Sequence, residues 1–430
     1  MLFVAVVPLC LWLAAGCDTR ILVGHVGDLG GGGGGSGGGP GPGMGSGGSP
    51  GTGSGGGPGM GGAVGGGGGY IGGSGGGGGA GGGPPGDACI IPAPMPVRRL
   101  VIPATEAVRR VTRLVWGDQA APPDMVPPLA TSQDVGLLAS SMLARRRDGA
   151  VALLESWLGS NVARTAAPDP EVAGRFSEDL RTSMLGGVNA FLDDALASGM
   201  TLRALLTTTD TFADQRLSTI YDVPPVMGPV FARVSWRQPV SAGILTQSAQ
   251  LFAAPRPSRR GVWVLSSFEC MDIPPPPAPP PVMPPFPQPG MGTDREQLWA
   301  AVNQPVCAAC HNLIDPVGFT FEHFDPLGAY RTLDNGKPID SSGSIQFSDG
   351  TARMLGSVDQ LGVALAERCE VRDCAMRSVL AAALSRPALR FSGVMGDSND
   401  SEVRAAFAAT GGVLRDLFVI IAQSQAFLAP

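Results

Sequence analysis

The sequence predicts a mainly α-helical protein with two folded parts. A helical domain and a second α domain are expected to be joined by a proline-rich strut, after a disordered glycine-rich tether. Three observations support this. Apolar residues recur at helical spacing in segments that end at glycine. Between these segments lies a run dominated by proline, and near the start lies a tract of almost pure glycine, so that the 430 residues include 65 glycines and 40 prolines.

Residues 1–17 are apolar throughout and end in Leu-Ala-Ala-Gly-Cys. This ending resembles the lipobox of bacterial lipoprotein signal peptides, in which cleavage precedes a cysteine that becomes lipidated, here Cys17. The apolar run is too short for a membrane-spanning helix. We therefore expect a lipoprotein of the cell envelope, anchored to the periplasmic face of a membrane or to the cell surface. An ordinary cleaved signal or an uncleaved anchor would also place the body in a compartment that permits disulfides.

Residues 18–87 are predicted to be a disordered linker, because Gly, Ser and Pro cannot bury enough apolar surface to offset the entropy lost on ordering. Such a chain behaves as a flexible tether with an average reach of roughly 40 Å.

Residues 88–273 are predicted to form the helical domain. A helix beginning at Asp169-Pro170-Glu171 is expected because an acidic N-cap followed by proline favours helix initiation. It should break near Gly186-Gly187 and end at Gly199. A short hairpin is expected within 230–253. The other predicted helices cover 106–116, 134–144, 150–158, 201–208 and 211–221.

Residues 274–292 contain the run PPPPAPPPVMPPFPQP, which favours the polyproline II conformation and predicts a semi-rigid spacer. A ligand for a proline-binding module is the less favoured interpretation. Residues 293–430 should form the second α domain, from a helix over 294–302 to an amphipathic helix over 412–427.

Cys307-Ala308-Ala309-Cys310-His311 is the c-type haem attachment signature. Its two thiols are spaced to reach the two vinyl groups of one porphyrin, and the imidazole that follows can bind the iron. The signature predicts covalent haem c with His311 as an iron ligand. Met354, in the loop-like segment SDGTARMLG, ranks first among the methionines as the second metal ligand, and an open coordination position is the alternative.

The same cysteines permit three other interpretations. Cys307 and Cys310 could form a four-thiolate zinc site with Cys369 and Cys374, a redox-active dithiol, or a structural disulfide. A zinc site gives no reason for His311 to follow the second cysteine directly, and exported proteins rarely keep four thiols reduced.

Four further cysteines of the exported body, Cys89, Cys270, Cys369 and Cys374, are candidates for two disulfides with three possible connectivities. A bridge from Cys270 to Cys369 or Cys374 would pin the two folded parts together.

The stretch CAACHNLIDPVGFTFEHFDPLGAYRT closely resembles the planctomycete-type cytochrome C domain of large exported planctomycete and myxobacterial proteins. Upstream, RTSMLGGVNAFLDDALASGMTLRALL is similar to the helical planctomycete-specific domain that precedes it. CAMRSVLAAALSRPALR and VLRDLFVIIAQSQAFLAP resemble the small domain that closes these proteins. The resemblance covers roughly residues 150–430, and all of these domains are of unknown function.

The resemblance implies that Cys307 and Cys310 are thioether cysteines, that His311 is the proximal ligand, and that the second part is cytochrome c-like. It also covers Asp315, Pro316, Gly318, Phe319, Glu322, Phe324, Asp325, Gly328 and Arg331. From the glycines and Pro316 we expect a tight turn after the histidine, and from Phe319 and Phe324 we expect apolar walls for the macrocycle. Arg331 would pair with a haem propionate or form a salt bridge to Glu322 or Asp325. His323 stands where relatives usually have asparagine.

Electron transfer near the membrane, to or from an unidentified redox protein, is the function predicted. The net charge of −6 and the lack of basic runs argue against nucleic acid as a partner. An electron carrier is favoured over an enzyme, because the sequence has no phosphate-binding glycine loop and no Ser-His-Asp pattern. The alternatives are a membrane-tethered binding or assembly module with a disulfide or zinc at the CxxC motif, and a peroxidase-type haem enzyme using His323.

Overall fold

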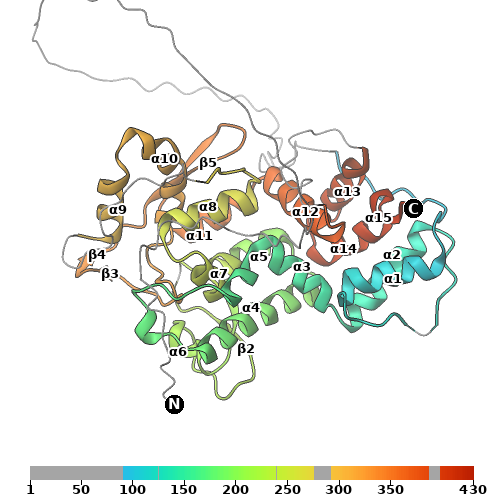
Figure 1. Ribbon diagram of the computed structural model, residues 1–430, viewed down its shortest axis with the longest axis horizontal. Coiled ribbons are helices and arrows are strands. Elements are labelled where there is room, and N and C mark those ends of the chain that lie inside the picture. The colour runs from blue at the N-terminus through green and yellow to red at the C-terminus, as the bar shows by residue number, and fades with distance from the viewer. Residues whose placement is uncertain (1–90, 124, 239, 276–291, 387–397) are drawn as a thin grey trace, which may run out of the picture. The chain divides into compact units, whose positions relative to one another are not determined.

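A computed structural model describes residues 91–123, 125–238, 240–275, 292–386 and 398–430. These residues all belong to one compact unit, and the mainly helical fold predicted from the sequence is confirmed (Figure 1). The predicted signal peptide with Cys17, the glycine-rich linker, Cys89 and nearly all of the proline-rich strut lie outside the described residues. Every helix in the described ranges is too short or too polar to cross a membrane.

Fifteen α-helices are present in the described ranges: α1 (Ala104–Trp116), α2 (Ser132–Arg145), α3 (Asp148–Leu158), α4 (Glu178–Ser198), α5 (Leu202–Thr207), α6 (Leu217–Ile220), α7 (Ser248–Ala253), α8 (Pro257–Phe268), α9 (Asp294–Val302), α10 (Pro305–Phe319), α11 (Val358–Ala366), α12 (Cys369–Ala383), α13 (Ser398–Ala409), α14 (Leu414–Gln423) and α15 (Gln425–Leu428). Three antiparallel strand pairs accompany them there: β1 (Asp210–Ala213) with β2 (Ala232–Ser235), β3 (Leu333–Asp334) with β4 (Lys337–Pro338), and β5 (Gly343–Gln346) with β6 (Ala352–Leu355).

Terminal glycines mark the helix ends that the sequence predicts. Gly117, Gly159 and Gly199 follow α1, α3 and α4, and all three have positive φ. This backbone region is open to glycine at little steric cost. At the other end, Thr131 forms a capping box with Asp134 at the start of α2. Local signals of this kind fix the helix boundaries to within a few residues.

The predicted helix start at Asp169-Pro170-Glu171 is wrong. Helix α4 begins at Glu178, after Ser177, whose hydroxyl accepts a hydrogen bond from a backbone N–H of the first turn. The Asp169 carboxylate accepts instead from the Arg256 guanidinium at 2.8 Å. The same carboxylate also accepts from the backbone N–H of Glu171 at 3.0 Å, so Asp169 closes a local turn that does not continue into α4.

The predicted break at Gly186-Gly187 is also wrong, because α4 runs through both residues. A Cβ added to Gly186 would lie 2.4 Å from the Phe231 ring, and one added to Gly187 would lie 2.6 Å from Leu217. These glycines therefore allow close packing on one face of the helix.

The predicted helix over 211–221 is replaced by strand β1 and the short α6, and the hairpin expected within 230–253 does not form by itself. Strand β2 pairs with β1, with Thr211 opposite Val234. The buried Thr211 hydroxyl donates to the Gln247 side chain at 3.0 Å. The partner of β2 lies about twenty residues upstream, so the pairing cannot be predicted from the periodicity of either segment alone.

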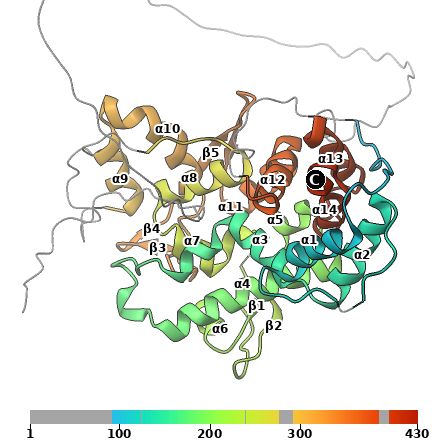
Figure 2. The same ribbon diagram turned by 45° about the vertical axis from the view of Figure 1, so that its right-hand side comes forward.

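The two predicted folded parts share one hydrophobic core. Helix α14 packs against α1 and α2, and α12 packs against α3 and α8, so the C-terminal helices return to the N-terminal ones (Figures 1 and 2). The polypeptide on both sides of the proline-rich segment therefore folds as one unit.

The predicted bridge between the two parts is confirmed for one pair. Cys270, just after α8, is disulfide-bonded to Cys374 of α12, with a Cα–Cα distance of 5.5 Å and a sequence separation of 104 residues. Closing a loop of this length is worth about 5 kcal/mol in the chain-entropy account. Cys369 is also disulfide-bonded.

Candidate functional site

The CAACH segment lies on α10, which crosses α8 at backbone contact. A Cβ added to Gly261 of α8 would lie 1.9 Å from the Ile314 carbonyl oxygen, and one added to Gly318 of α10 would lie 1.9 Å from that of Pro257. Both glycines thus sit where two helix backbones touch. This contact determines which α8 side chains can reach the site.

The expected tight turn at Pro316 is not present. Helix α10 continues through Pro316 to Phe319. Proline disfavours a helix interior because it lacks an N–H donor. Here α10 is packed against α8 on one side and β5 on another, and this tertiary packing outweighs the local preference.

Cys307 and Cys310 are both free thiols, three residues apart on α10. Cys310 is exposed, whereas Cys307 is half-buried against a small apolar cluster of Leu298, Val302 and Phe319. The plain disulfide weighed for this pair is therefore not the arrangement found. Of the two phenylalanines expected as walls for the macrocycle, Phe319 packs against Cys307. Phe324 packs in the main core against Trp236 and Tyr330.

The four-thiolate zinc interpretation is contradicted. It needs Cys369 and Cys374 as thiolates, but Cys374 is bonded to Cys270 and Cys369 is also in a disulfide. A cystine sulfur is not a thiolate ligand. Nor do the described residues bring together three or more His, Cys, Asp or Glu side chains that could hold a metal ion. The strand–turn–helix setting expected for a redox dithiol is missing too, since a short loop and helix α9 precede α10.

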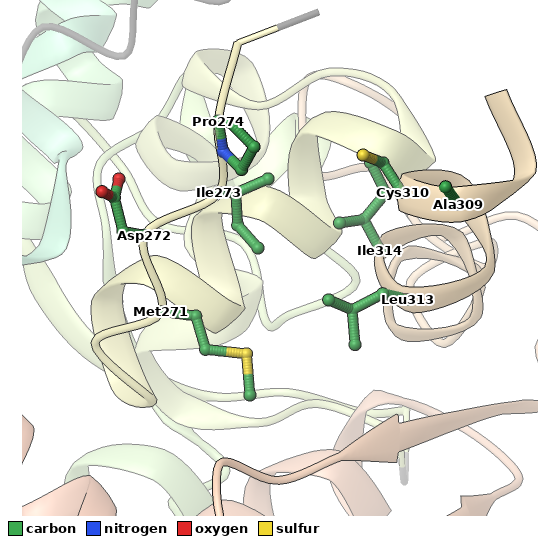
Figure 3. A pocket seen from close by; sticks show the side chains of 8 residues that line it. All are labelled: Met271, Asp272, Ile273, Pro274, Ala309, Cys310, Leu313 and Ile314. Carbon is green, nitrogen blue, oxygen red and sulfur yellow. The ribbon is translucent and has the colours of Figure 1, made fainter. Parts of the chain in front are cut away.

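An open cavity of about 330 Å³ lies beside Cys310 (Figure 3). Its walls are mostly apolar side chains from the segment after α8 and from one face of α10. The lining residues are Met271, Asp272, Ile273, Pro274, Ala309, Cys310, Leu313 and Ile314. Figure 3 shows Met271 reaching across this space toward Leu313. Sequence reasoning missed Met271 because it precedes the proline-rich run and was assigned to the other folded part.

His311 is held by a buried carboxylate. Its Nδ1 lies 2.9 Å from Asp315 Oδ2, one helical turn further along α10. The Ser258 hydroxyl of α8 donates to Asp315 Oδ1 at 2.6 Å and lies 3.5 Å from His311 Nδ1. The Asp315 side chain is 0% exposed and that of His311 is 26% exposed. If the Asp315 carboxylate accepts from Nδ1–H, the neutral imidazole keeps its lone pair on Nε2, the nitrogen that could then bind a metal.

The other candidate ligands lie elsewhere. Met354 is on β6, with 79% of its surface exposed, and the structure does not place it among the residues that line the cavity. The His323 Nδ1 lies 2.9 Å from the Arg331 carbonyl oxygen, and its ring stacks on Tyr330. His323 thus has a structural role at the turn after α10.

Arg331 lies in a network of carboxylates. It contacts Glu171 at 2.9 Å, Glu322 at 3.6 Å and Asp334 at 3.7 Å. These contacts favour the salt-bridge interpretation over a pairing with a haem propionate. Asp325, the other expected partner, instead forms an ion pair with Arg175, which lies in the N-terminal part of the chain.

Glu322 should make stability depend on pH. Burial raises the pKa of this carboxyl from 4.5 to about 7, against the opposing charges of Arg331 and Arg260. Between these values the folded protein keeps a proton that the unfolded chain has released. Its contribution to stability is therefore fully present below about pH 4.5 and is lost as the pH rises through about 7, at no more than about 1.4 kcal/mol per pH unit.

Glu322→Gln, whose amide stays neutral, should flatten this part of the profile. Urea unfolding between pH 4.5 and 8 measures the difference between wild type and variant. Glu178→Gln, at an exposed position of α4, is the matched control and should follow the wild-type profile. Parallel profiles for wild type and Glu322→Gln would contradict the prediction.

Ser258, Met271 and the CAACH motif all fall within one match to a protein family. Residues 240–334 match PSCyt3, a protein family of unknown function (DUF1588), and residues 128–223 match PSD4, also of unknown function (DUF1592). The chain contains a PSD4 domain and a PSCyt3 domain. No curated protein and no solved structure matches the chain.

The PSCyt3 match, a planctomycete cytochrome-like family, begins before the proline-rich segment and ends after α10. It includes α8 with Ser258, the cavity segment with Met271, and the CAACH motif. Residues on both sides of the proline-rich run thus belong to one family region. Neither match reaches the C-terminal segment, whose resemblance to a small closing domain stays a prediction.

Proposed function

We propose that the PSCyt3 domain carries a covalently attached c-type haem and serves as an electron carrier. Cys307 and Cys310 would form the thioether bonds, and His311 would be the proximal iron ligand. The observation that carries this proposal is the contact between His311 Nδ1 and a buried carboxylate, on the same helix as two free thiols. This is the arrangement of groups that haem c attachment requires.

One wall beside Cys310 would suit such a group; Cys307 and His311 lie on the same helix but are not among the residues that line this cavity. The cavity beside Cys310 is lined mainly by apolar side chains such as Ile273, Leu313 and Ile314. They would exclude water from the part of the macrocycle nearest α10. When bound, haem supplies a one-electron ferric/ferrous couple, which the protein tunes through ligands, hydrogen bonds and burial.

As a second iron ligand, Met271 would be better placed than Met354. Met271 lines the cavity next to Cys310, whereas Met354 is largely exposed on β6. A thioether raises the reduction potential of a haem. In the assembled protein, loss of the weak far-red thioether–iron band in Met271→Ala, but not in Met354→Ala, would identify the ligand.

Export, which the apolar N-terminal segment predicts, would fit this function, since haem c is attached outside the cytoplasm. The lipobox-like ending at Cys17 supports a lipid anchor, and the glycine-rich segment that follows supports a tether. We therefore place the electron carrier near a membrane of the cell envelope, where it would exchange electrons with a redox protein.

The full chain, made in a host with c-type maturation machinery, tests the proposal. After a denaturing gel, staining for haem peroxidase activity should label the wild type and not the double variant Cys307→Ala, Cys310→Ala. Ala308→Ser is the matched control, because it changes the same segment and leaves the signature intact. An unstained wild type would overturn the proposal in favour of a tethered binding module.

A further inference from the structure

The hydrogen-bonded chain Ser258–Asp315–His311, centred on a buried carboxylate, joins two helices that belong to different parts of the sequence. One carboxylate oxygen of Asp315 accepts from the Ser258 hydroxyl at 2.6 Å. The other oxygen lies 2.9 Å from His311 Nδ1. A histidine and an aspartate four residues apart on a helix can form a simple surface pair. Here the carboxylate is 0% exposed, so burying it requires that its partners satisfy it.

We propose that Asp315 is a positioning residue that sets both the orientation and the electron donation of His311. This inference rests on the proposed haem function. By holding the hydrogen on Nδ1, Asp315 directs the Nε2 lone pair toward the iron. Its negative charge also makes the imidazole a more basic ligand, which stabilises the ferric state and lowers the reduction potential.

Ser258 moderates this effect from α8. Its hydroxyl donates to the carboxylate and so draws negative charge away from the oxygen that faces His311. Because α8 and α10 touch at Gly261 and Gly318, the distance from Ser258 to Asp315 is fixed by backbone packing. The contact between the two helices therefore takes part in setting the potential.

Two substitutions should shift the potential in opposite directions. Asp315→Asn removes the charge at nearly constant volume and should raise the reduction potential, by about a tenfold change in the reduction equilibrium, or 59 mV. Ser258→Ala leaves the charge in place without its donor and should lower the potential by a smaller amount. A merely structural role would not produce opposite signs. Equal potentials, or shifts of the same sign, in haem-loaded protein would overturn the proposal.

A haem-free measurement separates this inference from the proposed function. In the full chain with Cys307→Ser and Cys310→Ser, long-range ¹H–¹⁵N spectra at alkaline pH report which nitrogen of His311 carries the hydrogen. The chain has 3 histidines, so substituting His25 and His323 assigns the signals. In this haem-free parent we expect the hydrogen on Nδ1. In its Asp315→Leu variant we expect the preference for Nδ1 to be lost. An Nε2–H tautomer in the haem-free parent would overturn the inference, whether or not haem binds.

Discussion

Gly318→Ala should lower the free energy of unfolding by about 3 kcal/mol or more. The added methyl group would lie 1.9 Å from the backbone oxygen of Pro257, the first residue of α8. A backbone oxygen cannot rotate away as a side chain does, so the helices must separate. Urea unfolding measures the loss. In haem-loaded protein the same substitution should also disturb the Ser258–Asp315 contact and shift the reduction potential.

The prediction has a partner and a control in the chain. Gly261→Ala, on the opposite helix, would meet the Ile314 carbonyl oxygen at 1.9 Å and should cost a similar amount. Gly174→Ala meets nothing within 4 Å and should change stability by no more than a few tenths of a kcal/mol. Wild-type stability in both Gly318→Ala and Gly261→Ala would show that the helices are not in backbone contact.

Arg260→Met should cost about 3–5 kcal/mol. Arg260 is only 2% exposed and donates to the backbone oxygens of Ala254, Phe321 and Phe324 at 2.9–3.1 Å. Burial lowers the pKa of this guanidinium to about 10, so it stays charged at neutral pH. Methionine keeps much of the apolar stem but removes one donor from each of three backbone oxygens, of which that of Phe321 keeps a second donor, the Phe324 N–H. Thermal or urea unfolding should show the loss.

Arg259→Met is the matched control for this experiment. Arg259 is the preceding residue of α8 and is exposed, so the same change there should stay within about 0.5 kcal/mol. Arg260→Lys should recover only part of the loss, because a single ammonium cannot reproduce the fork of guanidinium donors. Equal stability of the Arg259 and Arg260 variants would refute the role assigned to Arg260.

Local signals in the sequence were sufficient for most helices and for the attachment segment. Glycines that end α1, α3 and α4 predicted those ends, since positive φ is a property of one residue. The helix at Asp294–Val302 was predicted with its observed bounds. By contrast, Pro316 predicted a turn and lies inside α10, because the packing of that helix outweighs the cost of one missing hydrogen bond.

The candidate site shows the same division. The sequence by itself determined that Cys307, Cys310 and His311 lie together, because they are within five consecutive residues of the chain. It also identified Cys270 as a disulfide candidate. Only the tertiary structure decided that Ser258 reaches Asp315 and that Met271 lines the cavity beside Cys310. Both come from segments before the proline-rich run. They meet α10 because two glycines let α8 and α10 touch, a long-range contact that no local pattern encodes.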